Sequence, residues 1–304
     1  MNYNLITILG PTATGKTKVA ANLASDLNGE IISADSRQVY KGMNIGTGKD
    51  LDEFIGRNIT YYLIDICETE DEYNLFRFKE DFASAFKLIL NKNKTPILVG
   101  GTGLYISAVI QDYCLPALKD SKEEFNRLNE LTKDELLKLF LSLNPKLHNK
   151  TDLIHKERII RAILIEKSRK EIQSRNSNIH SLNIGIRPDN STIKKNITNR
   201  LKARLNSGMI EEVKGLLGKG VTEEKLIFFG LEYKYITQHI IGELNYNDMF
   251  QKLNSAIHGY AKRQITWFRK MEKEGVEINW FSGKNYDEIL HFTKAKLKNQ
   301  NADS

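Results

Sequence analysis

The segment LITILGPTATGKT (residues 5–17) joins an apolar strand pattern to a loop of small residues. Residues 10–17 match the pattern G-x-x-x-x-G-K-[ST], and helical spacing of apolar residues follows over residues 17–27. In a loop of this kind the backbone N–H groups point at phosphate oxygens, Lys16 adds a positive charge, and the Thr17 hydroxyl typically reaches Mg²⁺. The segment therefore predicts a strand, a phosphate loop and a helix that bind a di- or triphosphate.

Two further strand patterns and a helix pattern extend this unit. The strand patterns lie at residues 30–35 (EIISAD) and 95–101 (TPILVGG), and an amphipathic helix is expected over residues 76–93. This alternation predicts an α/β fold with a parallel sheet, in which ligands bind at the carboxyl ends of the strands. From about residue 113 to residue 196 the pattern becomes mostly helical, with one strand-like segment at residues 181–188.

The composition is that of an ordinary globular protein. The 304 residues are 40% apolar and 27% charged, and no apolar run approaches the roughly 18 residues that cross a bilayer. The first ten residues lack the basic region of a signal peptide, and the two cysteines, Cys67 and Cys114, match no zinc or disulfide pattern. We expect a cytoplasmic protein without a membrane anchor.

Charge is spread unevenly along the chain, although the total is only +7. Residues 1–112 hold 11 lysines and arginines against 14 acidic residues, whereas residues 113–304 hold 34 against 24. A near-neutral first part and a basic second part suggest a chemical site beside a surface that binds a polyanion. A lysine-rich surface that is merely solvated is the alternative.

Asp35 ends the second strand pattern and precedes the polar run SRQVY (residues 36–40). At the carboxyl edge of the sheet it would face the phosphate end of a ligand. It could hold a metal ion, accept a proton from a nucleophile, or cap the following turn. The residue alone leaves these roles open, and phosphate loops serve ATPases, kinases and transferases alike.

Five motifs, found in a fixed order, indicate which class of phosphate-loop protein this is. They are GPTATGKT (10–17), ADSRQVYKGMNIGT (34–47), LIDI (63–66), VGGTGLYISAV (99–109) and AKRQITWFR (261–269). Together they resemble the motifs of the tRNA dimethylallyltransferases, also called tRNA isopentenyltransferases or IPP transferases. The middle of the chain matches more loosely, chiefly through ERIIRAI (157–163).

The resemblance implies a reaction and an architecture. A dimethylallyl group would move from dimethylallyl diphosphate to N6 of the adenine that is 3′-adjacent to the tRNA anticodon, with release of diphosphate. It also implies a P-loop NTPase-like core of residues 1–112 and about 197–304, with C-terminal helices packing back on it. A mostly helical insertion of about residues 113–196 would contact the anticodon stem-loop, and the family suggests a monomer.

The resemblance also assigns residues. The catalytic residues would be Asp35 as general base, Thr102 and Lys16, with Mg²⁺ as cofactor at Thr17. Diphosphate would be bound by Gly10, Thr12, Ala13, Thr14, Gly15, Lys16, Thr17 and Arg200. Transfer RNA would be bound by Asp35, Ser36, Arg37, Gln38, Arg158, Ile159, Ile160, Arg161, Ala162, Lys262 and Arg263.

Two positions depart from the usual motifs, because His258 and Asn196 stand where the family usually has arginine. A small-molecule or nucleoside kinase is the runner-up, with Arg158 and Arg161 closing over a phosphate. A third reading is an RNA-binding protein that keeps a vestigial phosphate loop, which the intact Lys16, Thr17 and Asp35 disfavour.

Overall fold

The computed structural model describes residues 3–113, 121–143, 156, 159–160, 162–164 and 178–298. The chain divides into two compact units. The first, here the core unit, is formed by Met1–Gln111 and Ile179–Ser304, and the second, here the insertion, is formed by Asp112–Asn178. No helix among the described residues is long and apolar enough to cross a membrane.

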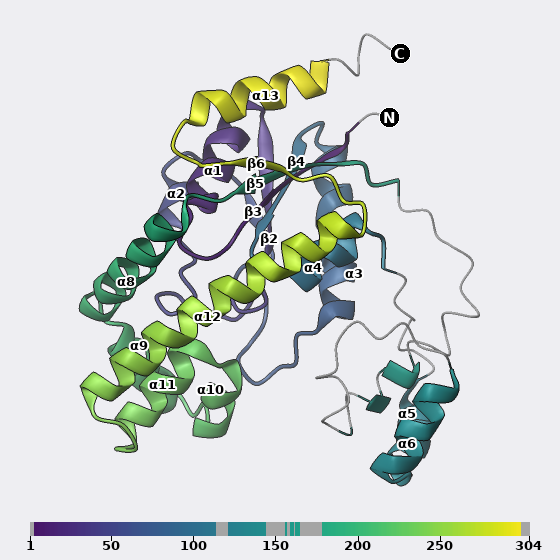
Figure 1. Ribbon diagram of the computed structural model, residues 1–304, viewed down its shortest axis with the longest axis vertical. Helices are drawn as coiled ribbons and strands as arrows, with labels where there is room; N and C mark the ends of the chain where they lie inside the picture. Colours follow the sequence, from purple (N-terminus) through teal and green to yellow (C-terminus); the bar gives the residue numbers. More distant parts are fainter. Residues whose placement is uncertain are drawn as a thin grey trace. The chain divides into compact units, whose positions relative to one another are not determined.

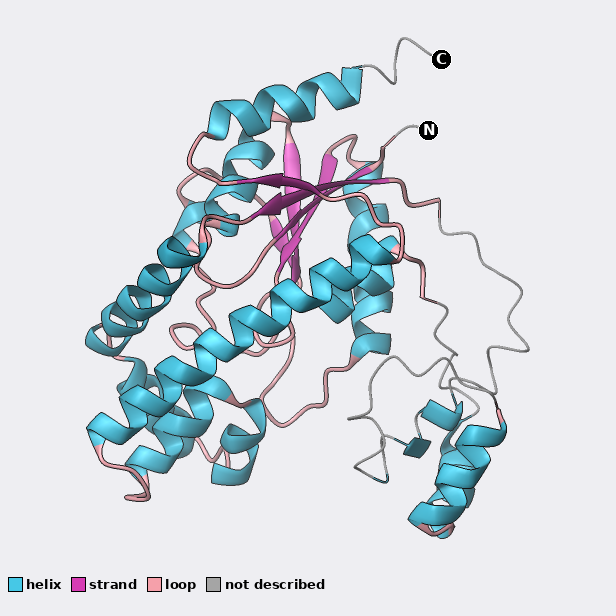
Figure 2. Ribbon diagram, viewed as in Figure 1, coloured by secondary structure: helices cyan, strands magenta, loops and turns pink. Residues whose placement is uncertain are grey.

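The core unit is built on a six-stranded parallel sheet, drawn in magenta in Figure 2. Its strand order is β3-β2-β4-β1-β5-β6, and its strands are β1 (Leu5–Leu9), β2 (Gly29–Ala34), β3 (Tyr61–Tyr62), β4 (Thr95–Gly100), β5 (Ser181–Ile186) and β6 (Asn279–Phe281). Gly100, the last residue of β4, is in register with both Leu9 of β1 and Ala34 of β2. Three segments therefore leave the sheet side by side at one edge.

Helices cover both faces of this sheet (Figure 1). Those before the insertion are α1 (Lys16–Asp26), α2 (Asp52–Ile55), α3 (Leu75–Asn91) and α4 (Gly103–Ile110). Those after it are α8 (Asn190–Asn206), α9 (Met209–Gly218), α10 (Glu223–Phe229), α11 (Leu231–Ile240), α12 (Tyr246–Lys273) and α13 (Tyr286–Lys298). The long helix α12 packs against α4, α8 and α11, so the C-terminal part of the chain returns to the N-terminal part.

Alternation along the strands separates two apolar cores. In β1, Leu5 and Leu9 join the core that includes residues of α3, α4, α8 and α12, whereas Ile6 and Ile8 join the core under α1 and α13. Both faces are buried, which explains why the strands read as nearly continuous apolar runs. The predicted α/β class with a parallel sheet and returning C-terminal helices is confirmed.

One domain boundary differs from the sequence-based expectation. The strand-like segment near residues 181–188 is β5, and it pairs with β1 through Ile8 and Ile184 inside the sheet. The core unit therefore resumes at Ile179, earlier than the expected start at about residue 197. An isolated strand pattern among helical ones gave no indication of the sheet to which it belongs.

The insertion has its own small core. Its described helices include α5 (Ser121–Glu130) and α6 (Lys133–Ser142), and α6 begins with a capping box between Thr132 and Glu135. Its buried side chains are Leu128, Leu136, Phe140, Ile159, Ile160, Ile163 and Leu164.

A buried carboxylate stabilises the edge of the core-unit sheet away from the three aligned strand ends. Glu30, near the start of β2, has only 1% of its side chain exposed. It accepts hydrogen bonds from Lys94 at 2.8 Å, from Tyr62 at 2.7 Å and from Lys92 at 3.1 Å. Burial opposes ionisation, but the hydrogen bonds from these three residues outweigh it and lower the pKa of Glu30 to about 2.

We expect Glu30→Gln to lower the free energy of unfolding at neutral pH by about 1–2 kcal/mol, since both lysines are partly exposed and screened. Because the folded pKa of Glu30 is depressed, its contribution is present above the ordinary value of 4.5 and is lost as the pH falls towards about 2. Urea unfolding of both proteins at several pH values measures this. A wild-type advantage that stayed constant as the pH fell below 4.5 would contradict the assignment.

Candidate active site

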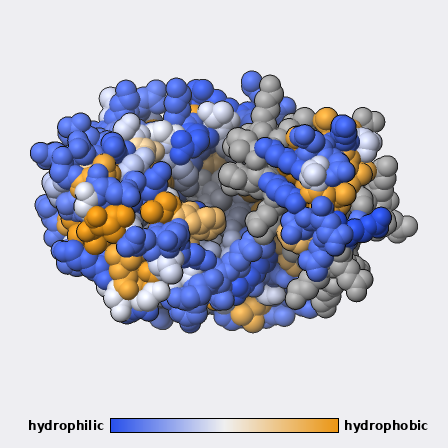
Figure 3. Space-filling model, turned by 90° about the horizontal axis from the view of Figure 1, so that it is seen from below, coloured by the Kyte–Doolittle hydropathy of each residue, from blue (hydrophilic) through white to orange (hydrophobic). Residues whose placement is uncertain are grey.

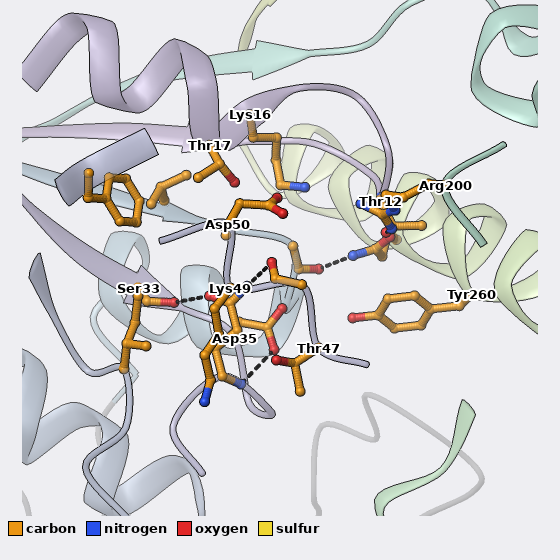
Figure 4. Close-up of a pocket in the computed structure, with 18 residues that line it drawn as sticks. Thr12, Lys16, Thr17, Ser33, Asp35, Thr47, Lys49, Asp50, Arg200 and Tyr260 are labelled. Atoms are coloured by element: carbon orange, nitrogen blue, oxygen red, sulfur yellow. Dashed lines mark hydrogen bonds between the residues drawn. The ribbon is translucent and has the colours of Figure 1, made fainter. Parts of the chain in front are cut away.

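A polar pocket lies at the edge where β1, β2 and β4 end together (Figure 4). The phosphate loop, the residues after β2, the loop before α2, and helices α8 and α12 all contribute to it. Its polar lining consists of Thr12, Lys16, Thr17, Ser33, Asp35, Gln38, Thr47, Lys49, Asp50, Arg200, Tyr260 and Gln264. The structure thus brings Asp35 and Lys16 into one pocket, as the sequence predicts.

The phosphate loop has the backbone that its small residues allow. Gly10 has φ +157°, and a Cβ on it would lie 2.3 Å from the carbonyl oxygen of Ile186 on β5. Ala13 and Gly15 both have positive φ, and Gly15 immediately precedes α1. The loop therefore turns tightly and presents its N–H groups at the N-terminus of an eleven-residue helix.

Side chains of the loop fold back on its own backbone. The Thr14 hydroxyl and the Lys16 ammonium both donate to the carbonyl of Pro11, each at 3.0 Å. Asn196 of α8 donates to the carbonyl of Ala13 at 3.2 Å. Asn196 therefore reaches the loop even though it replaces the arginine usual in the family.

Two cations meet in the pocket. Burial and the neighbouring Arg200 lower the pKa of Lys16 to about 8, while Asp35 and Asp50 act in the opposite direction. Burial and Arg204 lower the pKa of Arg200 to about 10, and Arg200 donates to the Thr12 hydroxyl. The pocket therefore disfavours the charged forms of Lys16 and Arg200. A polyanion bound between these two side chains would stabilise their charged forms.

Gln264 of α12 connects two of the loops. Its side-chain oxygen accepts from the N–H of Thr12, and its amide nitrogen donates to the carbonyl of Gly101, both at 2.8 Å. A Cβ on Gly101 would lie 2.3 Å from that nitrogen, so only glycine fits there without displacement. This amide fixes the spacing between the phosphate loop and the segment after β4.

Asp35 follows the last residue of β2 and is partly buried. Its Oδ1 accepts from the N–H of Arg37 at 2.9 Å and from the N–H of Gln38 at 3.4 Å, so it does cap the next turn. Within the described ranges, Oδ2 has no hydrogen-bond donor. Capping therefore uses one oxygen and leaves the other for a ligand.

Thr102 and Tyr260 lie beside Asp35. Thr102 precedes α4, and its hydroxyl accepts from the N–H of Ser36 at 3.2 Å. Tyr260 of α12 points its hydroxyl into the pocket (Figure 4). Burial and then the Asp35 carboxylate raise the pKa of Tyr260, while a hydrogen bond with Thr102 opposes this, so the phenol stays protonated.

The loop between Gly42 and Asp50 closes one side of the pocket. The Gln38 amide accepts from the Ser33 hydroxyl and donates to the carbonyl of Gly48, each at 3.0 Å. Glu212 of α9 accepts from three successive N–H groups, those of residues 44–46, which holds the loop against the helices.

Lys49 anchors the same loop from inside. Its ammonium donates to the carbonyl of Tyr40, to Asn44 and to Asp65, and only 2% of its side chain is exposed. Burial lowers the pKa of Lys49, although the Asp65 carboxylate opposes the shift. Asp50 follows with φ +47° and faces the Lys16 side of the pocket (Figure 4).

Other predicted site residues lie outside the pocket lining. Lys262 and Arg263 are exposed on α12, and the Arg263 guanidinium lies 5.9 Å from the Tyr260 ring. Arg37 extends towards α10, where it contacts Phe228 and Phe229. His258 contacts the Thr198 hydroxyl at 3.4 Å.

The predicted RNA-contacting segment of the insertion is described only in part. Arg158 and Arg161 lie outside the described residues. Ile159 and Ile160 are 0% exposed and their side chains lie in the core of the insertion, and Ala162 packs against that core, so their predicted contact with RNA stays a prediction. The apolar side chains of two adjacent isoleucines on a helix favour burial in a core over contact with a polyanion.

Sequence reasoning did not select Tyr260, Gln264, Lys49 or Asp50 as site residues. Tyr260 and Gln264 are four residues apart on α12, so they share one helical face. Gln264 lies within the recognised AKRQ motif, whereas Lys49 and Asp50 lie just beyond the motif that ends at Thr47, after Gly48. Only Gln264 therefore belongs to a recognised motif, and the other three residues lie next to motif ends, where nothing in the sequence indicates which side chains point into the pocket.

Comparisons with known proteins identify the family of this chain. The IPP transferase family model matches residues 38–271. The tRNA dimethylallyltransferase 2 of Syntrophotalea carbinolica is 48% identical over 286 residues, which cover 93% of this chain and 95% of that protein. The tRNA dimethylallyltransferase 1 of Azobacteroides pseudotrichonymphae is 51% identical over 285 residues, covering 91% and 92%.

The fold is also similar to that of a solved structure. The full-length tRNA isopentenylpyrophosphate transferase of Bacillus halodurans has a TM-score of 0.72 and 30% identity, and the match covers 98% of each chain. Matches of this extent confirm the family that the five motifs predict and do not favour the kinase alternative. The chain belongs to the tRNA dimethylallyltransferase family, the IPP transferases.

Proposed function

We propose that the protein transfers a dimethylallyl group from dimethylallyl diphosphate to N6 of the adenine 3′-adjacent to the anticodon of a tRNA. The C–O bond to diphosphate breaks, a C–N bond to N6 forms, and one N6 proton leaves. The observation that carries the proposal is that one pocket holds a phosphate loop and a carboxylate whose Oδ2 has no hydrogen-bond donor in the described part of the chain. Its relatives bear the name of this reaction.

The loop, Lys16 and Arg200 would hold the diphosphate. Charge develops on diphosphate as the C–O bond breaks, and preorganised N–H groups and cations stabilise such charge in a site shielded from water. Ammonium and guanidinium groups with lowered pKa values are suited to a dianionic or trianionic group, which restores their preference for the charged form. No phosphoryl group is transferred in this scheme.

The chemistry of the pocket lining would suit a magnesium ion beside the diphosphate. The Thr17 hydroxyl and the Asp50 carboxylate are hard oxygen donors in the lining, the type that Mg²⁺ prefers. Among the described residues no group of three or more His, Cys, Asp or Glu could enclose a metal. Thr17 would hold the ion, whose charge would assist departure of the diphosphate.

Asp35 would act as the general base. The lone pair of an adenine amine is delocalised into the ring, so the amine needs to lose a proton as the C–N bond forms. Oδ1 is engaged by the turn, and Oδ2 would accept this proton. Thr102 and Tyr260 would place the adenine beside it, since both have hydroxyl groups next to Asp35.

Residues around the pocket would bind the tRNA. Gln38 would read an adenine edge, because each atom of its amide keeps one further hydrogen-bonding position beyond the bonds to Ser33 and Gly48. Arg37, Lys262 and Arg263 would contact backbone phosphates, as would Arg158 and Arg161 in the insertion. The monomeric state and the cytoplasmic location stay predictions.

Asp35→Asn is expected to lower kcat by about 10²–10⁴-fold while tRNA affinity is kept, because the general base is lost. Asparagine retains the Oδ1 acceptor for the N–H groups of Arg37 and Gln38, so the turn is preserved. Single-turnover rates with a saturating anticodon stem-loop measure the effect. Asp52→Asn, an exposed carboxylate outside the pocket lining, is the control. Near wild-type turnover by Asp35→Asn would rule out the role of Asp35.

Affinity for diphosphate should fall as the pH rises above about 8. Lys16 is charged below its lowered pKa and neutral above it, so its attraction for diphosphate is lost in that direction. Calorimetric titration with magnesium diphosphate across this range measures the decline, which can approach tenfold per pH unit. Lys16→Met should bind more weakly and lack the decline. The same pH dependence in both proteins would assign it to the diphosphate itself and contradict the role of Lys16.

A further inference from the structure

One aromatic side chain of the core unit is strongly exposed beside the guanidinium of Arg37, a residue of the turn that follows Asp35. Phe228, near the end of α10, is 65% exposed, the largest value among the big apolar side chains that the structure describes. Its neighbour Phe229 is 3% exposed and packs on Tyr40, with ring centroids 4.8 Å apart. Phe229 therefore fills the apolar core at this position. Packing in the core does not explain why the neighbouring Phe228 side chain is exposed.

Two cations flank the exposed ring. The Arg37 guanidinium lies 5.6 Å from the centroid of Phe228, and the Lys225 ammonium lies 5.9 Å from it. Lys225 is held in place by the carbonyls of Glu70 and Asp71, each at 3.2 Å. No carboxylate within the described ranges forms an ion pair with either cation, so both can still neutralise a phosphate.

The backbone connects this ring to the pocket. The N–H of Arg37 donates to Asp35, and the Arg37 side chain then spans from that turn to Phe228. A nucleotide next to an adenine placed at Asp35 would thus lie within reach of Arg37. In Figure 3, seen from below, hydrophobic side chains interrupt the hydrophilic surface at the end of the core unit that carries α9, α10 and α11.

We propose that Phe228, Arg37 and Lys225, here the Phe228 platform, bind an unstacked nucleotide that flanks the target adenine. The inference rests on the proposed function, since it takes tRNA as the substrate. The base would stack on the Phe228 ring, and its phosphates would lie near Arg37 and Lys225. Proteins that bind single-stranded RNA combine aromatic faces with cations in this way. A single exposed ring between cations is too small for a stable protein partner.

Fluorescent RNA tests the platform without turnover. Anticodon stem-loops carrying 2-aminopurine on either side of the target adenine are titrated with the full-length protein and Mg²⁺, in the absence of dimethylallyl diphosphate. The wild-type protein should quench one of the two probes by stacking. Phe228→Ala should lose this quenching and raise Kd roughly tenfold, the effect of losing one stacked base. Its kcat at saturating RNA should change little.

Substitutions of matched size separate stacking from other causes. Phe228→Trp should keep affinity and quenching, whereas Phe228→Leu, apolar but without a π face, should resemble Phe228→Ala. Ile55→Ala is the control: it removes a 63% exposed apolar side chain of α2 and should change neither the affinity for RNA nor the quenching of the probe.

Unchanged Kd in Phe228→Ala, wild-type affinity in Phe228→Leu, or no quenching of either probe by the wild-type protein would overturn the platform. If the proposed function itself is wrong, the wild-type protein will make no prenylated RNA when dimethylallyl diphosphate is added. This result is distinct from those that overturn the platform alone.

Discussion

The parallel pairing of β4 with both β1 and β2 is the constraint on which the site depends. Register places Leu9, Gly100 and Ala34 side by side, so the phosphate loop, Asp35 and the Gly101 segment begin at one edge. The approach is close: a Cβ on Gly100 would lie 2.2 Å from the carbonyl oxygen of Ala34. A leaving-group site and a base thus become neighbours through backbone hydrogen bonds alone.

The C-terminal part of the chain supplies further residues to the pocket at the sheet edge. Arg200 reaches the phosphate loop from α8, and α12 supplies Tyr260 beside Asp35 and the Gln264 amide between two loops. These contacts separate the charges of the pocket: the cations with lowered pKa values lie where we propose that diphosphate binds, and the capped carboxylate lies where we propose that the amine binds. Such an arrangement favours carbon transfer, with diphosphate as the leaving group.

Local patterns were enough to predict the α/β class, the phosphate loop and the polar end of β2, because strand and loop signals act over a few residues. They could not place β5, whose partner β1 lies more than 170 residues earlier. Gln264 and Tyr260 were missed for the same reason, since their contacts with Thr12, Gly101 and Thr102 are set by the packing of α12. The burial of Ile159 and Ile160 follows from a core that the motif does not reveal.

In the proposed reaction this pocket moves a prenyl group onto an adenine amine. Mass spectrometry of nucleosides from a tRNA incubated with the protein, Mg²⁺ and dimethylallyl diphosphate tests it most directly. We expect one dimethylallyl group on N6 of the adenosine 3′-adjacent to the anticodon, with one diphosphate released per group transferred. Unmodified tRNA under these conditions, together with phosphoryl transfer from ATP to a nucleoside by the same preparation, would contradict it.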